Sequence, residues 1–202
     1  MAATCGPAAL LAWQVAFAFS LLMMKDFSVG DWLKQRFLLY ASVHMLIMPL
    51  LAMTIWSFAT NQYFWQIPSW FWLYSLVSYF LAFNWEVSRK IRAPEDEVEG
   101  VDSYTRLFGT YGAAYLVLLI RVISTVLVAM VAHHLGLSIW FYVLLLLLFL
   151  ACLVGFFQYR FQTSAKTARR MEIYAAIYIV AFDLALAIEL GRTYGLRING
   201  AM

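Results

Sequence analysis

The chain has 202 residues, of which 64% are apolar and 12% are charged, and its formal net charge is +3. An ordinary globular chain is roughly 45–50% apolar and about 25% charged, so a soluble fold of this length could not bury so much apolar surface. The composition excludes a nucleic-acid-binding module, a disordered chain, a secreted disulfide scaffold and a water-soluble enzyme. It predicts a protein whose solvent is the lipid bilayer.

Six apolar runs are long enough to cross a bilayer as helices, which takes about 20 residues each. The runs cover about 7–24, 37–59, 69–88, 111–133, 138–158 and 172–191. Uniformly apolar runs of this length favour helices over the alternating strands of a membrane barrel. We therefore predict an all-α polytopic membrane protein that forms one transmembrane domain over residues 1–202.

Basic residues gather in the connections that alternate onto one face of the predicted bundle. Eleven of the fourteen lysines and arginines lie there: Lys25, Lys34, Arg36, Arg89, Lys90, Arg92, Arg106, Arg160, Lys166, Arg169 and Arg170. Arg121 lies within a predicted helix, and the opposite face carries only Arg192 and Arg197. By the positive-inside rule, the basic face is cytoplasmic and both termini lie outside. We expect an integral protein of the bacterial inner membrane.

The most heavily charged stretch begins where the third predicted helix ends. Glu86, Arg89 and Lys90 are spaced i, i+3 and i+4, so they share one face of that helix. Pro94 disfavours helix at the residue before it, so we expect a loop over 89–110. Three more carboxylates lie on this loop: Glu95, Asp96 and Glu97.

Carboxylates and cations in this arrangement could bind a diphosphate together with Mg²⁺, because Mg²⁺ is held by carboxylates and substrate phosphates and basic groups neutralise the remaining charge. The predicted metal ligands are Glu86, Glu95, Asp96 and Glu97. The predicted diphosphate-binding residues are Arg89, Lys90 and Lys25. The alternative, which the spacing alone favours, is an interfacial helix end whose charges are simply solvated.

The charged residues inside or at the ends of the predicted helices are Glu86, Arg121, Glu172, Asp183 and Glu189, and of these Arg121, Asp183 and Glu189 lie away from the basic connections. An ionisable side chain at the centre of a membrane helix costs at least about 2.5–3.5 kcal/mol, so it should face protein or a wet cavity. We expect structural charges, with Arg121 paired to Asp183 or Glu189. A transport path through the same residues is disfavoured, because the sequence has no pair of interrupted helices. His44 is expected to be a hydrogen-bonded packing residue.

The stretch from Glu86 to Gly109 resembles the UbiA superfamily of intramembrane prenyltransferases. In that family an acidic second motif is followed by a glycine, a Ser/Thr pair and a closing Phe-Gly or Leu-Gly. Gly100, Ser103 and Phe108-Gly109 match this spacing. The segments 27–32 and 40–49 are also similar to a divergent branch of the family.

The resemblance implies nine helices and two Asp-rich motifs that bind Mg²⁺ and the diphosphate of a polyprenyl donor, whose prenyl group passes to an aromatic or lipid acceptor. The six predicted helices would be the last six of the nine, without the first motif, and Arg92 stands near an expected Asp. We therefore expect a prenyltransferase that is incomplete as a single chain and needs another membrane subunit or a homo-oligomer. The alternative is a non-catalytic UbiA-like subunit that braces a larger complex or binds a quinone, pigment or lipid tail.

Overall fold

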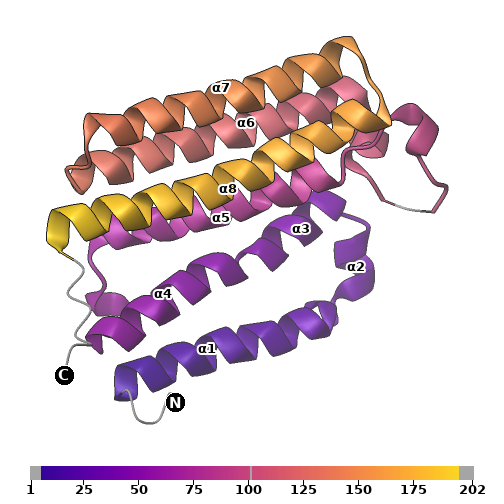
Figure 1. Cartoon of the computed structure of the whole chain (residues 1–202). Coiled ribbons are helices and arrows are strands. Elements are labelled where there is room, and N and C mark those ends of the chain that lie inside the picture. The colour runs from indigo at the N-terminus through magenta and orange to yellow at the C-terminus, as the bar shows by residue number, and fades with distance from the viewer. Residues whose placement is uncertain (1–5, 101, 196–202) are drawn as a thin grey trace, which may run out of the picture. The chain divides into compact units, whose positions relative to one another are not determined.

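The computed structural model describes residues 6–100 and 102–195, and within them every regular element is helical (Figure 1). The helices are α1 (Pro7–Met24), α2 (Gly30–Lys34), α3 (Phe37–Met45), α4 (Ile47–Thr60), α5 (Ser69–Arg89), α6 (Tyr104–His134), α7 (Ile139–Phe161) and α8 (Ala165–Tyr194). Short 3₁₀ turns are η2 (Asp26–Ser28), η3 (Phe64–Gln66) and η4 (Pro94–Asp96). The all-α prediction is confirmed. Arg197 and both termini lie outside the described residues.

Five helical segments of the described chain are long and apolar enough to cross a membrane, which marks an integral membrane protein. They are Pro7–Met24, Phe37–Thr60, Tyr104–His134, Ile139–Phe161 and Ala165–Tyr194. The predicted sixth span corresponds to α5, which has 21 residues but falls short in hydropathy because it contains polar residues such as Ser75, Asn84 and Glu86. The sidedness of the connections stays a prediction from the charge pattern.

The chain divides into two compact units, Met1–Glu86 and Val87–Met202. In the first unit, α1 lies along α4 (Figure 1). Ala8, Ala12 and Ala16 recur every four residues on α1, and all three are buried. The Thr54 hydroxyl of α4 donates to the Leu50 carbonyl at 2.7 Å and also reaches the Ala12 carbonyl at 3.3 Å. The small side chains therefore let the two backbones approach closely, as membrane helices require.

The predicted helix over 37–59 is interrupted once, at Leu46, which separates α3 from α4. Pro49 explains the break, because its ring clashes with the carbonyl four residues earlier, at Met45, and it has no N–H to donate there. Pro49 itself lies in the first turn of α4, where a missing N–H leaves no intrahelical bond unmade.

In the second unit, α6 and α8 both pack against α7. The predicted start of α8 is wrong by seven residues, since the helix begins at Ala165 rather than 172. Helix α6 begins at Tyr104, but its backbone is non-helical at Gly109 (φ 71°, ψ 167°), so its continuous span starts just after this kink, close to the predicted 111. Ser103 and Ser164 cap these earlier starts by accepting hydrogen bonds from the N–H groups of Arg106 and Thr167. The loop predicted over 89–110 therefore contains a short helical turn, which runs from Tyr104 to the kink at Gly109.

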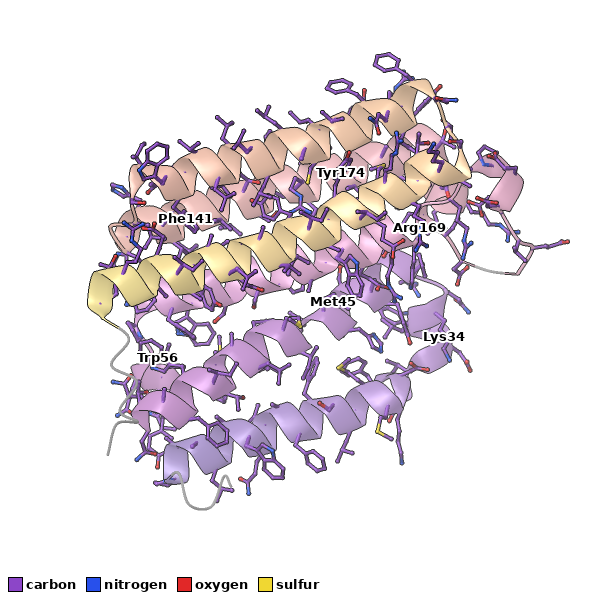
Figure 2. All side chains as sticks on the ribbon, in the orientation of Figure 1. Lys34, Met45, Trp56, Phe141, Arg169 and Tyr174 are labelled. Atoms are coloured by element: carbon purple, nitrogen blue, oxygen red, sulfur yellow. The ribbon has the colours of Figure 1, made fainter. Side chains whose placement is uncertain are left out.

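Close contact between α7 and α8 depends on Gly155. A Cβ atom at this position would lie 2.5 Å from the ring of Tyr174 on α8, well inside contact distance. Tyr174 belongs to α8 and is labelled in Figure 2, and its carbonyl accepts a weak bond from the Cys152 thiol at 3.7 Å. The absence of a side chain at Gly155 thus sets the spacing of the two helices.

Candidate functional site

The loop between α5 and α6 is fastened by the carboxylate of Glu97. The hydroxyl of Ser103 donates to both Glu97 oxygens, at 2.7 and 2.9 Å, and the hydroxyl of Thr105 donates to one of them. Ser103 and Thr105 are both buried. Because this carboxylate also lies at the N-terminus of α6, the helix dipole favours its negative charge there. Glu97 is therefore a structural residue of the loop.

Arg92 is held by its backbone at the same loop. Its N–H donates to the hydroxyl of Thr105 at 3.3 Å, and its carbonyl accepts from the phenol of Tyr159 on α7 at 2.7 Å. The N–H of Tyr104 also donates to the carbonyl of Lys90 at 3.3 Å, which ties the end of α5 to the start of α6. These bonds fix the path of the loop next to its cations.

The backbone of Arg92 is hydrogen-bonded, but its side chain has an unpaired donor. Its Nε atom is buried and has no hydrogen-bond acceptor among the described residues. Most buried polar groups in proteins are paired, so an unpaired donor calls for an explanation such as a bound ion or ligand. The loop thus holds in place a cation with a spare donor.

The other predicted site residues differ in how far they are buried. Glu86 is buried on α5, whereas Arg89, Glu95 and Lys25 are exposed, and Lys90 and Asp96 are half-buried. Among the described residues, no three His, Cys, Asp or Glu side chains gather closely enough to hold a metal ion. Lys25 belongs to the first unit and ends α1. The metal and diphosphate assignments stay predictions.

A second cluster, in the first unit, surrounds Asp26. Its carboxylate accepts hydrogen bonds from the phenol of Tyr40 at 2.9 Å and pairs with the ammonium of Lys34 at 2.7 Å. His44 Nε2 lies 4.0 Å from the same carboxylate, and its ring stacks on Tyr40 with 4.1 Å between centroids. His44 therefore packs as expected, with its Nδ1 2.8 Å from the Tyr40 carbonyl.

The backbone beneath this cluster is strained. Asp26, Phe27 and Ser28 all have positive φ angles, at 47°, 56° and 59°. Non-glycine residues adopt this left-handed region at a cost of roughly 1–2 kcal/mol each. A Cβ atom on Gly30 would lie 3.0 Å from the Cβ atom of Asp26 and 3.1 Å from its carboxylate, so a larger residue there would have to displace Asp26 slightly. The contacts of Asp26 hold this turn in place.

We expect the contribution of Asp26 to stability to depend on pH. The hydrogen bond from Lys34 and the one from Tyr40 hold the pKa of the Asp26 carboxyl below its ordinary value of 3.8, and the same pair raises the pKa of Lys34 above 10.5. The contribution of the Asp26–Lys34 pair to folding stability is fully present between pH 3.8 and pH 10.5. It is lost as the pH falls below 3.8 toward the folded-state pKa of Asp26, and again as the pH rises through that of Lys34.

Thermal unfolding in detergent, measured from pH 3 to 11, tests this dependence. The wild-type protein should exceed Asp26→Asn in melting temperature by a constant margin at neutral pH, and the margin should shrink toward both extremes. Asp31→Asn is the control at the acid end, because this nearby carboxylate forms no hydrogen bond or ion pair among the described residues; at the alkaline end its charge also raises the pKa of Lys34. A margin that is the same at every pH would contradict the assignment.

The expected ion pair between Arg121 and a carboxylate of α8 is not formed. Glu189 instead accepts hydrogen bonds from the Ser138 N–H at 3.2 Å and hydroxyl at 2.9 Å, and lies 3.8 Å from Arg192. Asp183 is exposed. Arg121 is buried with its guanidinium 3.9 Å above the ring of Tyr178, where a cation–π interaction can stabilise its charge.

We expect Glu189→Ala to destabilise the protein by about 1.5–3 kcal/mol, because it removes charged hydrogen bonds at the N-terminus of α7. Glu172→Ala is the control: it changes the same charge on α8 at a half-buried residue with no hydrogen bond or ion pair in the described chain. Reversible unfolding in mixed detergent micelles measures both. Equal losses would show that the contact with Ser138 adds nothing.

Sequence reasoning missed the structural roles of Tyr159, Thr105 and Asp26. Tyr159 lies 67 residues from the carbonyl that it bonds, so no local pattern could reveal it. Asp26 had a signal, because it lies between Lys25 and the segment 27–32 that carried part of the resemblance. Comparison of the chain with protein-family models, with curated proteins and with solved structures finds no match.

Proposed function

We propose that this protein is a UbiA-like intramembrane prenyltransferase, which binds the diphosphate of a polyprenyl donor at the loop between α5 and α6 and passes the prenyl group to an aromatic or lipid acceptor. The resemblance over Glu86 to Gly109 supplies the reaction class. One observation carries the proposal: the N–H and the carbonyl of Arg92 are both hydrogen-bonded, while its side-chain Nε has no acceptor among the described residues.

Arg92 has the chemistry of a phosphate ligand. Its buried Nε has no acceptor among the described residues, and a buried donor left unpaired costs about 1–3 kcal/mol. A diphosphate oxygen would accept this bond, and the guanidinium fork matches phosphate oxygens in a bidentate manner. Arg89 and Lys90, at the end of α5, would neutralise further charge on the headgroup.

The carboxylates of η4 fit a magnesium ion that is shared with the substrate. Mg²⁺ is usually held by one or two carboxylates together with substrate phosphates. Glu95 is exposed and Asp96 half-buried on this turn, and both would ligate the ion, whereas Glu97 is engaged by Ser103 and Thr105. Glu86 belongs to the first unit and stays a ligand predicted from the sequence. When bound, the ion would stabilise the charge on the departing diphosphate.

Binding of labelled geranylgeranyl diphosphate to the full chain in nanodiscs, with and without Mg²⁺, tests the proposal. Loss of one charged contact should weaken binding about tenfold in Arg92→Gln. Arg106→Gln is the control, because this exposed arginine on the first turn of α6 removes the same charge. Prenyl transfer, assayed with any co-purifying subunit, should be lost in Asp96→Asn and Glu86→Gln. Absence of saturable donor binding, or equal losses in the two arginine variants, would overturn the proposal.

Asp183 favours a second candidate function, that of a membrane subunit within a larger assembly. Its carboxyl group is exposed near the middle of α8 on a face with Val180, Leu184 and Ile188, all more than half exposed. A carboxyl facing lipid is costly, and a hydrogen bond to a partner helix would offset this cost. Light scattering in mild detergent should show a dimer or a complex that Asp183→Leu weakens and Asp183→Asn preserves. A stable monomer of the wild-type protein would contradict this candidate.

A further inference from the structure

A pocket of about 380 Å³ lies between the end of α7 and the beginning of α8. One wall consists of Val154, Phe157 and Phe161 on α7, and the other contains Arg170 and Thr167 on α8. All of these residues belong to the second unit. The pocket therefore combines an apolar wall with a cationic edge, and its lining contains no residue of the loop between α5 and α6.

The apolar wall is arranged along the helix axis. Val154, Phe157 and Phe161 follow one another over seven residues, which corresponds to about 10 Å of helix, and their exposed fractions are 48%, 49% and 83%. The rings of Phe157 and Phe161 are nearly parallel, with 6.1 Å between centroids. This is a strip of exposed hydrocarbon and aromatic surface that an extended lipid chain can cover.

The cationic edge is oriented but not neutralised. One guanidinium nitrogen of Arg170 donates to the side-chain carbonyl of Gln158 at 2.9 Å, and this is its one hydrogen bond within the described residues. Arginine has five N–H donors, so most of its donors stay available. Gln158 thus holds the guanidinium at the mouth of the pocket.

The surrounding charges are positive and lack carboxylate partners. The cations at this end of the unit are Arg160, Lys166, Arg169 and Arg170, and Figure 2 shows Arg169 at the start of α8. In the described chain none of the four forms an ion pair, and Arg160 lies 3.7 Å above the ring of Tyr111. Glu172, the carboxylate next to them in the sequence, forms no ion pair among the described residues. An anionic ligand would therefore complement the charge at this end.

We propose that this pocket binds one anionic phospholipid, with its phosphate on Arg170 and an acyl chain along Val154, Phe157 and Phe161. Basic pockets between membrane helices on the cytoplasmic side bind anionic headgroups, and the charge pattern predicts that this end is cytoplasmic. The inference does not depend on the proposed prenyl transfer, because it uses neither Arg92 nor η4.

Native mass spectrometry of the full chain, titrated with phosphatidylglycerol and with phosphatidylcholine of the same acyl chains, tests this site. The wild-type protein should bind one phosphatidylglycerol at least about fivefold more tightly than phosphatidylcholine, because one cation near the membrane surface contributes an affinity difference of about this size. Arg170→Gln should remove this preference and Arg106→Gln should keep it. Val154→Trp, which fills the apolar part, should weaken both lipids.

Three results would overturn the site. Equal affinity of the wild-type protein for the two lipids would remove the role of charge, and equal losses in Arg170→Gln and Arg106→Gln would show unspecific attraction. If geranylgeranyl diphosphate displaced phosphatidylglycerol one for one, and did so equally in Arg92→Gln, the pocket would be assigned to a prenyl donor instead. The melting temperature of each variant is measured in parallel, so that a folding defect is recognised. If Arg170→Gln does not fold, Val154→Trp still tests the site, because it leaves Arg170 intact.

Discussion

Glu97→Ala is expected to release the loop between α5 and α6. The substitution removes the hydrogen bonds from the Ser103 and Thr105 hydroxyls, and bonds to a charged group contribute about 1.5–3 kcal/mol each. Both hydroxyls are buried, and because they lie 3.0 Å apart only one of them could donate to the other, so the second would lose its acceptor. The start of α6 should then fray, and the Arg92 backbone should lose its bond to Thr105.

Hydrogen exchange measured on the protein in nanodiscs would report this change. We expect amides over 103–106 to exchange at least tenfold faster, the equivalent of about 1.4 kcal/mol of lost local stability, while those in the centre of α7 stay protected. Glu99→Ala is the matched control, because Glu99 is exposed on the same loop and makes no bond among the described residues. Unchanged exchange in Glu97→Ala, or the same change in Glu99→Ala, would refute the role assigned to Glu97.

Ala12→Leu should separate α1 from α4. Ala12 is 2% exposed, and its carbonyl lies 3.3 Å from the Thr54 hydroxyl of the facing helix. Extra methylenes in a packed interface cost about 1–3 kcal/mol, and no hydrophobic gain offsets this in lipid, because a leucine is as well solvated by lipid tails as by protein. The first unit should therefore loosen as a whole.

Steric trapping or unfolding in dodecyl sulfate measures the loss. The control is Ala18→Leu, which adds the same side chain at an exposed position of α1 and should leave stability within about 0.5 kcal/mol of the wild-type value. Retention of wild-type stability by Ala12→Leu would show that the alanines of α1 are not a packing surface.

Much of the fold follows from the sequence because hydrocarbon thickness sets the length of apolar runs. Helix α1 coincides with the predicted run at both ends. The start of α8 was misplaced because its first turn carries Lys166, and the short helical turn before the kink at Gly109 was missed because it carries Arg106; an apolar pattern excludes both residues. The serines that cap these helices were the signal that the pattern ignored.

The candidate site was less predictable for a physical reason. The carboxylates over 95–97 look alike in sequence, and only the folded loop shows that Glu97 is bound by two hydroxyls whereas Glu95 faces outward. The same is true of Arg121, which lies on the ring of Tyr178 rather than on a carboxylate of α8. A charge pattern states which groups need partners, but the choice among partners depends on distances between helices.

The pairing of α1 with α4 has a consequence for biosynthesis. Ala12 and Thr54 are 42 residues apart, and ribosomes add about 5–20 residues per second, so α1 waits for about 2–8 s before its partner is made. During that interval its row of alanines faces lipid or the insertion machinery. The nascent chain is therefore most exposed to mispairing at this step, and an insertase that shelters one small-residue helix would assist it.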